Sequence, residues 1–152
     1  MKLEVVIKSE KFKSEVHKAG LNILYTAWWL KTEISRELKE FGLTHEQYNV
    51  LRILRGKHPQ QMCVRDIASR MIEKNSNVPR IIDRLELKKW VDRSTSLEDK
   101  RETVIKLTVE GTKVLEQATV RLDNLYNKSI TVDDREAALL NNLLERVRAN
   151  EK

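Results

Sequence analysis

A short group of amide and basic side chains has the residue types that read DNA bases. Asn77 and Arg80 carry groups that form hydrogen bonds with base edges in the major groove. Ser76 and Arg84 can hold the neighbouring phosphates. These side chains can act together only if they share the exposed side of one helix. The sequence therefore predicts a DNA-reading helix with Arg80 at its centre.

A second basic group follows a few residues later and suits contacts to the DNA backbone or the minor groove. It consists of Arg93, Lys100 and Arg101. Such contacts orient a protein on the duplex and carry little sequence information. Asp99 lies two residues before Arg101, on the same side of an extended chain, and is predicted to hold that arginine in one orientation.

The apolar residues predict the helices that position the first group. Within residues 76–89 the spacing i, i+3, i+4, i+7 places four aliphatic side chains on one side: Val78, Ile81, Ile82 and Leu85. Ser76 is the expected N-cap, and Pro79 falls in the first turn, where it removes no intrahelical hydrogen bond. A shorter apolar stripe, Val64 to Met71, predicts a preceding helix. The two together form a helix-turn-helix candidate.

Two short β-rich runs predict the element that carries the second group. Residues 90–93 and 102–108 are rich in β-branched and aromatic types, and a polar tip, residues 94–100, separates them. Two strands around a basic tip form the wing of a winged helix.

These segments also resemble a known family. The runs LTHEQYNVLRIL, IASRM, SNVPRIIDRLELKKWVDR and DKRETVIKLTVEG look like the MarR (multiple antibiotic resistance regulator) family of bacterial transcription factors, over about residues 40–113. The most specific element is Asp99-Lys100-Arg101 followed by Val104 and Leu107-Thr108-x-x-Gly111. The resemblance implies a homodimeric winged-helix repressor or activator that binds a short palindrome and is often released by a small aromatic molecule.

The charge distribution agrees with a polyanionic partner. The net charge is +6, and residues 43–113 hold 15 basic and 10 acidic groups, whereas residues 114–152 hold 6 and 7. A moderate basic surplus is equally common on proteins that bind no nucleic acid, so the charge alone does not decide. No apolar run suits a signal peptide or a membrane span, and the single Cys63 fits a reducing compartment; we expect a cytoplasmic protein.

Long amphipathic helices are expected on both sides of the winged helix. The predicted architecture is mainly α with a small β-hairpin wing, in one domain, residues 1–152. Residues 44–108 form the DNA-binding module, and residues 11–40 and 109–149 form the dimerisation helices. Their apolar stripes exceed what a compact winged helix needs, which favours burial against a second copy. The alternative is that the two ends pack on each other within one monomer.

An aromatic cluster on the first long helix is a candidate effector site. The family resemblance puts a pocket near Tyr25, Trp28 and Trp29, and His17 is a polar partner on the same helix. Equally open is that one tryptophan belongs to the core and the other to the subunit interface. Cys63 invites redox sensing through a thiolate near Arg65, but a cysteine in an apolar run usually acts as a small buried side chain.

The sequence shows no enzyme constellation, no metal-binding spacing and no cofactor motif. It predicts a homodimeric regulator that binds an inverted-repeat operator, with recognition helices roughly 34 Å apart. Two alternatives stay open: a winged helix used as a protein-interaction module, and an architectural DNA binder that responds to no ligand.

Overall fold

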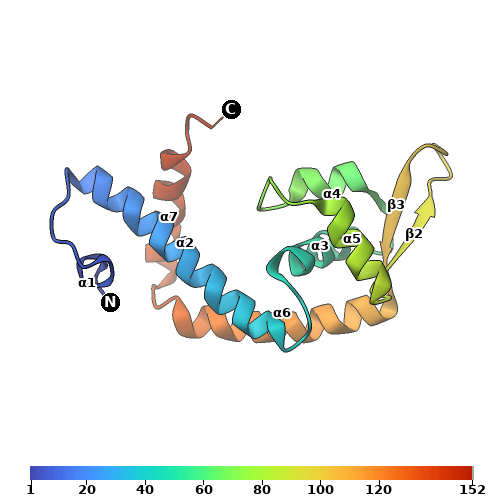
Figure 1. The fold of residues 1–152 in the computed structure, drawn as a ribbon, viewed down its shortest axis with the longest axis horizontal. Coiled ribbons are helices and arrows are strands. Elements are labelled where there is room, and N and C mark those ends of the chain that lie inside the picture. The colour runs from blue at the N-terminus through green and yellow to red at the C-terminus, as the bar shows by residue number, and fades with distance from the viewer. Residues whose placement is uncertain (152) are drawn as a thin grey trace. The chain divides into compact units, whose positions relative to one another are not determined.

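The computed structural model describes residues 1–151 and is mainly helical (Figure 1). The elements are α1 (Leu3–Ile7), α2 (Glu15–Lys39), α3 (His45–Arg55), β1 (Met62–Cys63), α4 (Val64–Arg70), α5 (Val78–Leu87), β2 (Val91–Thr95), β3 (Thr103–Leu107), α6 (Val109–Ser129) and α7 (Asp134–Val147). The chain divides into two compact units, residues 1–122 and residues 123–151, and α6 crosses from one to the other. The predicted fold class, a winged helix flanked by long helices, is confirmed.

Local sequence signals set the ends of α2 and α3. Gly42 has a φ of +66°, a left-handed conformation that glycine adopts without strain, and it follows α2 closely. Thr44 then caps α3 in a capping box with Gln47: each side chain bonds the other residue's backbone N–H, at 3.1 and 3.2 Å. The first long helix is shorter than predicted. It begins at Glu15 because the Ser14 hydroxyl accepts from the His17 N–H, and a separate short helix, α1, precedes it.

The wing is a hairpin within a small sheet of order β1-β3-β2. Val91 to Thr95 pair antiparallel with Leu107 to Thr103, and the hairpin extends past α4 and α5 in Figure 1. The two residues of β1 were not predicted, because a strand this short has no periodicity of its own. Their pairing with β3 makes β3 the central strand of the sheet. This pairing helps to bury Val104, which would be exposed if buried and exposed side chains simply alternated along β3.

The core of the first unit lies where α2 to α6 and the sheet meet. Its fully buried side chains are mostly aliphatic: Leu38, Leu51, Leu54, Ile67, Met71, Ile82, Leu85, Ile105 and Leu115 are among them. Gly111 lets the first turn of α6 lie close to the Trp90 backbone, since a Cβ at this position would lie 2.0 Å from the Trp90 carbonyl oxygen. Thr108 caps α6 through its hydroxyl, which accepts from the Gly111 N–H at 2.9 Å.

The second unit contains the end of α6 and all of α7. Asp133 and Glu136 form a capping box that starts α7. None of the α7 side chains is buried, and Leu139 and Val147 are 61% and 67% exposed. The apolar stripe predicted for the last helix is therefore uncovered in the single chain. Within residues 1–151 no helix has the length and hydropathy needed to cross a bilayer.

Candidate nucleic-acid interface

Helix α5 buries one side and presents arginines on the other. Val78, Ile82 and Leu85 are buried against the core, whereas Arg80 and Arg84 are exposed. Within residues 1–151 neither guanidinium pairs with a carboxylate. The structure thus brings together the two arginines that the sequence assigned to DNA, on one side of a short helix.

The predicted N-cap of this helix is wrong by one residue. Asn77 caps α5, and its Oδ1 accepts from the Arg80 N–H at 3.2 Å. Val78 and Pro79 then occupy the first two helical positions, so Pro79 is tolerated as expected. Ser76 lies before the cap, and its hydroxyl oxygen is covered and has no hydrogen-bond partner among the described residues. The Ser76 hydroxyl therefore does not face solvent, where a phosphate would bind.

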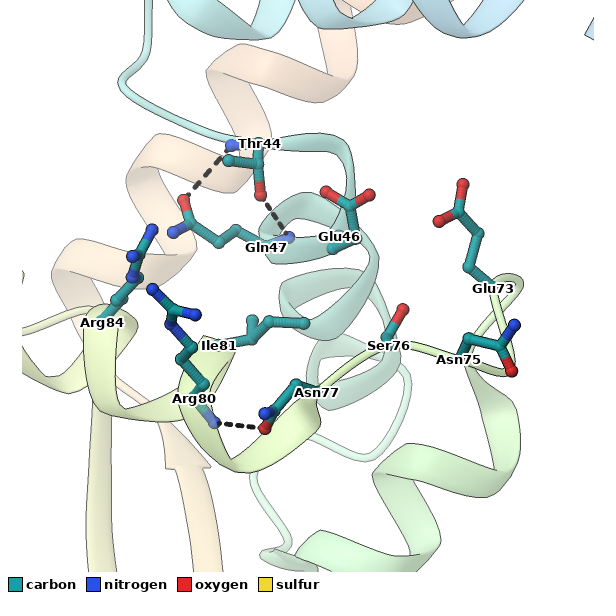
Figure 2. Close-up of a pocket in the computed structure, with 10 residues that line it drawn as sticks. All are labelled: Thr44, Glu46, Gln47, Glu73, Asn75, Ser76, Asn77, Arg80, Ile81 and Arg84. Carbon is teal, nitrogen blue, oxygen red and sulfur yellow. Dashed lines mark hydrogen bonds between the residues drawn. The ribbon is translucent and has the colours of Figure 1, made fainter. Parts of the chain in front are cut away.

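Arg80 and Arg84 line a hollow of about 460 Å³ between α5 and the start of α3, here called the α3–α5 hollow. Thr44, Glu46 and Gln47 line its α3 side, and Glu73, Asn75, Ser76, Asn77 and Ile81 complete it. Figure 2 shows both guanidinium groups extending from α5 toward the first turn of α3. Gln47 is only 4% exposed, because its capping bond holds it against the fold.

Lys88 ties the other end of α5 to the turn between α2 and α3. Its ammonium donates to the Gly42 carbonyl oxygen and lies 4.7 Å from the centroid of the Trp90 ring. Burial lowers the pKa of Lys88, and Arg84 adds to the effect. Gly42 is 46 residues from Lys88, so spacing gave no signal for that contact.

The wing tip presents Lys100 and Arg101 to solvent. Asp99 shapes this tip through the backbone: its Oδ1 accepts from the Arg101 N–H at 2.9 Å, and its carbonyl oxygen accepts from the Glu102 N–H at 2.9 Å. Asp99 therefore fixes the path of the chain at Arg101 through the backbone, and within residues 1–151 it forms no ion pair with the Arg101 guanidinium.

Arg93 does not face solvent as an unpaired cation. Its guanidinium forms an ion pair with Asp83 and a second with Glu86, where Nε lies 3.3 Å from Oε2. Both carboxylates belong to α5, so Arg93 joins β2 of the wing to α5. The predicted DNA contact would compete with these two ion pairs. The i, i+3 spacing of Asp83 and Glu86 was a signal that the sequence reading missed.

The aromatic cluster on α2 is only partly assembled. The Tyr25 and Trp28 rings lie 5.5 Å apart at an interplanar angle of 41°, and Trp28 is 60% exposed. Trp29 is half-buried on another side of the helix. His17 is exposed beside Phe12 and lies about 12 Å along the helix from Tyr25. The structure therefore joins Tyr25 with Trp28 and does not bring His17 to them.

Cys63 is a poor candidate for a reactive thiol. It is buried in β1, and burial raises the pKa of its thiol above the usual range. The Arg65 guanidinium lies 3.9 Å from the Glu102 carboxylate and is not among the causes of the Cys63 pKa shift, so the alternative of a thiolate activated by Arg65 gains no support. Within residues 1–151 no group of three or more histidine, cysteine or acidic side chains is arranged to hold a metal ion.

Comparisons with known proteins agree with this geometry. The sequence pattern of the MarR family matches residues 43–103. The HTH-type transcriptional regulator PrsX of Escherichia coli is 31% identical over 133 residues, which cover 84% of this chain and 80% of PrsX. Among solved structures, the organohalide-sensing regulator RdhR with bound 2,4-dichlorophenol has a TM-score of 0.80 and 21% identity, covering 91% of this chain and 82% of RdhR.

A second solved structure is the complex of S. aureus MepR with DNA, with a TM-score of 0.77 and 21% identity over 92% of this chain and 99% of MepR. At such identities the structures establish the fold, and the match to PrsX over most of both chains establishes the relationship. The resemblance read from the sequence is confirmed. This chain belongs to the MarR family and is a transcription regulator, not an enzyme.

Proposed function

We propose that this chain is a homodimeric, cytoplasmic repressor that binds an inverted-repeat operator through α5 and the wing. The observation that carries the proposal is the pair of exposed guanidinium groups, Arg80 and Arg84, on a helix whose opposite side is buried. An unpaired arginine on such a helix can donate two hydrogen bonds to a guanine edge without first giving up an intramolecular partner.

The side chains take different roles in this proposal. Arg80, in the first turn of α5, reads a base edge, and Arg84, one turn later, holds a phosphate. Lys100 and Arg101 at the wing tip reach a phosphate or the minor groove. The Oδ1 of Asn77 is engaged in capping, so only its amide N–H groups are available to DNA. Ser76 and Arg93 are not assigned direct contacts, because one is covered and the other is paired.

A second copy of the chain is the proposed cover for the exposed apolar helices. Helix α7 has no buried residue, and α2 exposes Val16, Leu24 and Trp28. Apolar surface of this kind is unusual on monomers. A two-fold dimer would place two α5 helices one turn of DNA apart, and the operator would repeat with the same symmetry. Sedimentation equilibrium at micromolar concentration is expected to give twice the chain mass.

A small aromatic effector is the proposed release signal. The partly exposed Tyr25 and Trp28 rings offer a stacking surface, and the related fold of RdhR has been solved with 2,4-dichlorophenol bound. A ligand can weaken DNA binding only if it binds the arrangement that does not fit DNA more tightly than the one that does. Quenching of tryptophan fluorescence on titration with chlorophenols, together with a matching loss of operator affinity, would support this role.

The decisive experiment for DNA binding is selection from a pool of random duplexes. The proposal predicts recovery of a palindrome. If Arg84, Lys100 and Arg101 each hold one phosphate per protomer, about six contacts per dimer give a slope of log affinity against log salt near −5. No enrichment, together with no duplex binding at low salt, would reject the proposal and favour a protein-interaction module.

A further inference from the structure

Lys31 joins three elements that are separate in sequence. Its ammonium, on α2, forms an ion pair with the Glu73 carboxylate and lies 3.6 Å from the Glu46 carboxylate. Glu46 is in the first turn of α3, and Glu73 lies in the connection between α4 and α5. The hydrogen bond to Glu73 is the main cause of a raised pKa for Lys31. The raised pKa favours the charged form of Lys31. We call Lys31, Glu46 and Glu73 the Lys31 cluster.

Glu73 sits where the start of the recognition helix is determined. It is four residues before the N-cap Asn77, and its carbonyl oxygen accepts from the Ser76 N–H at 3.2 Å. The preceding residue donates its Ile72 N–H to Asn49 Oδ1 at 3.0 Å, which ties the connection to α3. The connection is therefore held to α3 by one hydrogen bond and to α2 by Lys31.

The two acids of the cluster also line the α3–α5 hollow. Figure 2 shows Glu46 and Glu73 on one side of this hollow and Arg80 and Arg84 on the other. Neutralisation by Lys31 reduces the repulsion that two carboxylates beside the proposed DNA surface would exert on phosphates. The Lys31 cluster thus contacts the connection that precedes α5 and lies beside the arginines of α5.

Lys31 is also adjacent to the aromatic pair. It follows Trp28 by three residues, a spacing that places side chains next to each other on one side of a helix. Tyr25 precedes Trp28 by the same spacing, and the two rings are in contact. One side of α2 therefore carries the aromatic pair and, in the next turn, the connection to the recognition helix.

We propose that Lys31 is a positioning residue: its ion pairs with Glu73 and Glu46 set the start of α5 relative to α2, and so set operator affinity. The inference rests on the proposed DNA-binding function and deepens it. The three side chains are partly exposed, so the expected effect of removing Lys31 is moderate, about a 3- to 10-fold loss of operator affinity.

The test compares Lys31→Met, Lys31→Arg and Glu73→Gln with the matched control Arg36→Met, which removes the same charge from α2. Arg36 pairs within its own helix, with Glu33 at 2.5 Å, and joins no second element through that pair. We expect Lys31→Met and Glu73→Gln each to lower operator affinity, and the double variant to lose no more than the larger single loss. Lys31→Arg and Arg36→Met should stay within about two-fold of the parent.

Glu73→Gln separates positioning from simple charge. Removal of a carboxylate near DNA by itself strengthens binding, so a loss of affinity in this variant is expected only if the carboxylate positions α5. Parent-like or tighter operator binding by Glu73→Gln, or equal losses in Lys31→Met and Arg36→Met, would overturn the inference.

A second measurement needs no DNA. Hydrogen exchange of the amides in residues 72–80 should be several-fold faster in Lys31→Met than in Arg36→Met, with similar exchange in α3 after its first turn. Unchanged exchange in this segment would overturn the inference even if the parent protein bound no duplex. Failure of the proposed function would instead appear as absence of duplex binding by the parent itself.

Discussion

Asn77 could serve as the N-cap of α5 or as a base-reading residue, and three substitutions separate these two roles. The Asn77 Oδ1 accepts from the Arg80 N–H at 3.2 Å and satisfies a donor that α5 leaves free at its start. Asn77→Ala removes this acceptor and should cost about 1 kcal/mol of folding free energy, which lowers the melting temperature by roughly 2–4 °C. Asn77→Ser and Asn77→Asp retain a capping oxygen and should stay within a few tenths of a kcal/mol.

The DNA-binding assay then separates the roles. Serine caps well but cannot make the paired contact that an asparagine amide makes with adenine. We therefore expect Asn77→Ser to keep both its stability and its discrimination among operator variants in fluorescence anisotropy. A stable Asn77→Ser protein that loses about 1–3 kcal/mol of discrimination at one base pair would refute the reasoning, because the amide would then read a base. So would an Asn77→Ala protein as stable as the parent.

Three further predictions follow from the same contacts. Arg93→Met should lower operator affinity without changing the slope of log affinity against log salt concentration, because Arg93 joins the wing to Asp83 and Glu86. A slope smaller in magnitude by about 2 per dimer would show that Arg93 contacts phosphates instead. Burial lowers the pKa of His45 below its ordinary value of 6.5, so on acidification the unfolded chain binds a proton at His45 before the folded chain does, and the free energy of unfolding should fall as the pH drops below about 6.5. The free energy of unfolding measured in urea should therefore differ less between pH 5 and pH 7 in His45→Gln than in the parent. An equal difference in the two proteins would contradict this role of His45. The Cys63 thiol should react with a disulfide reagent much more slowly in the native protein than in urea, because it is buried. Treatment with peroxide should leave operator affinity unchanged. Fast reaction of the thiol in the native protein would contradict its burial.

The winged helix was predictable because its signals are local. The i, i+3, i+4, i+7 spacing from Val78 to Leu85 and the capping box of Thr44 with Gln47 each lie within a few residues, and helix geometry fixes their outcome. The N-cap was misplaced because Ser76 and Asn77 are both good capping residues. Only the path of the connection decides between them, and that path depends on contacts to α2 and α3.

The parts that sequence reasoning missed depend on pairs that are distant along the chain. Lys31 and Glu73 are 42 residues apart, and Lys88 and Gly42 are 46 apart. Charged residues are common on all the helices, so composition cannot select these partners. Arg93 was assigned to DNA for its charge and its place in the wing, whereas the two carboxylates that neutralise it lie one helix turn apart on α5. An unpaired cation can be identified only after the fold has placed its neighbours.

The most direct test of the central claim is the binding of Arg80→Ala to the selected operator and to a scrambled duplex of the same length at one salt concentration. If α5 presents Arg80 to a base edge, the variant should lose about 1–3 kcal/mol of discrimination at one symmetric base pair while its affinity for scrambled DNA changes little. Equal losses on both duplexes would contradict the claim, because Arg80 would then contribute charge alone.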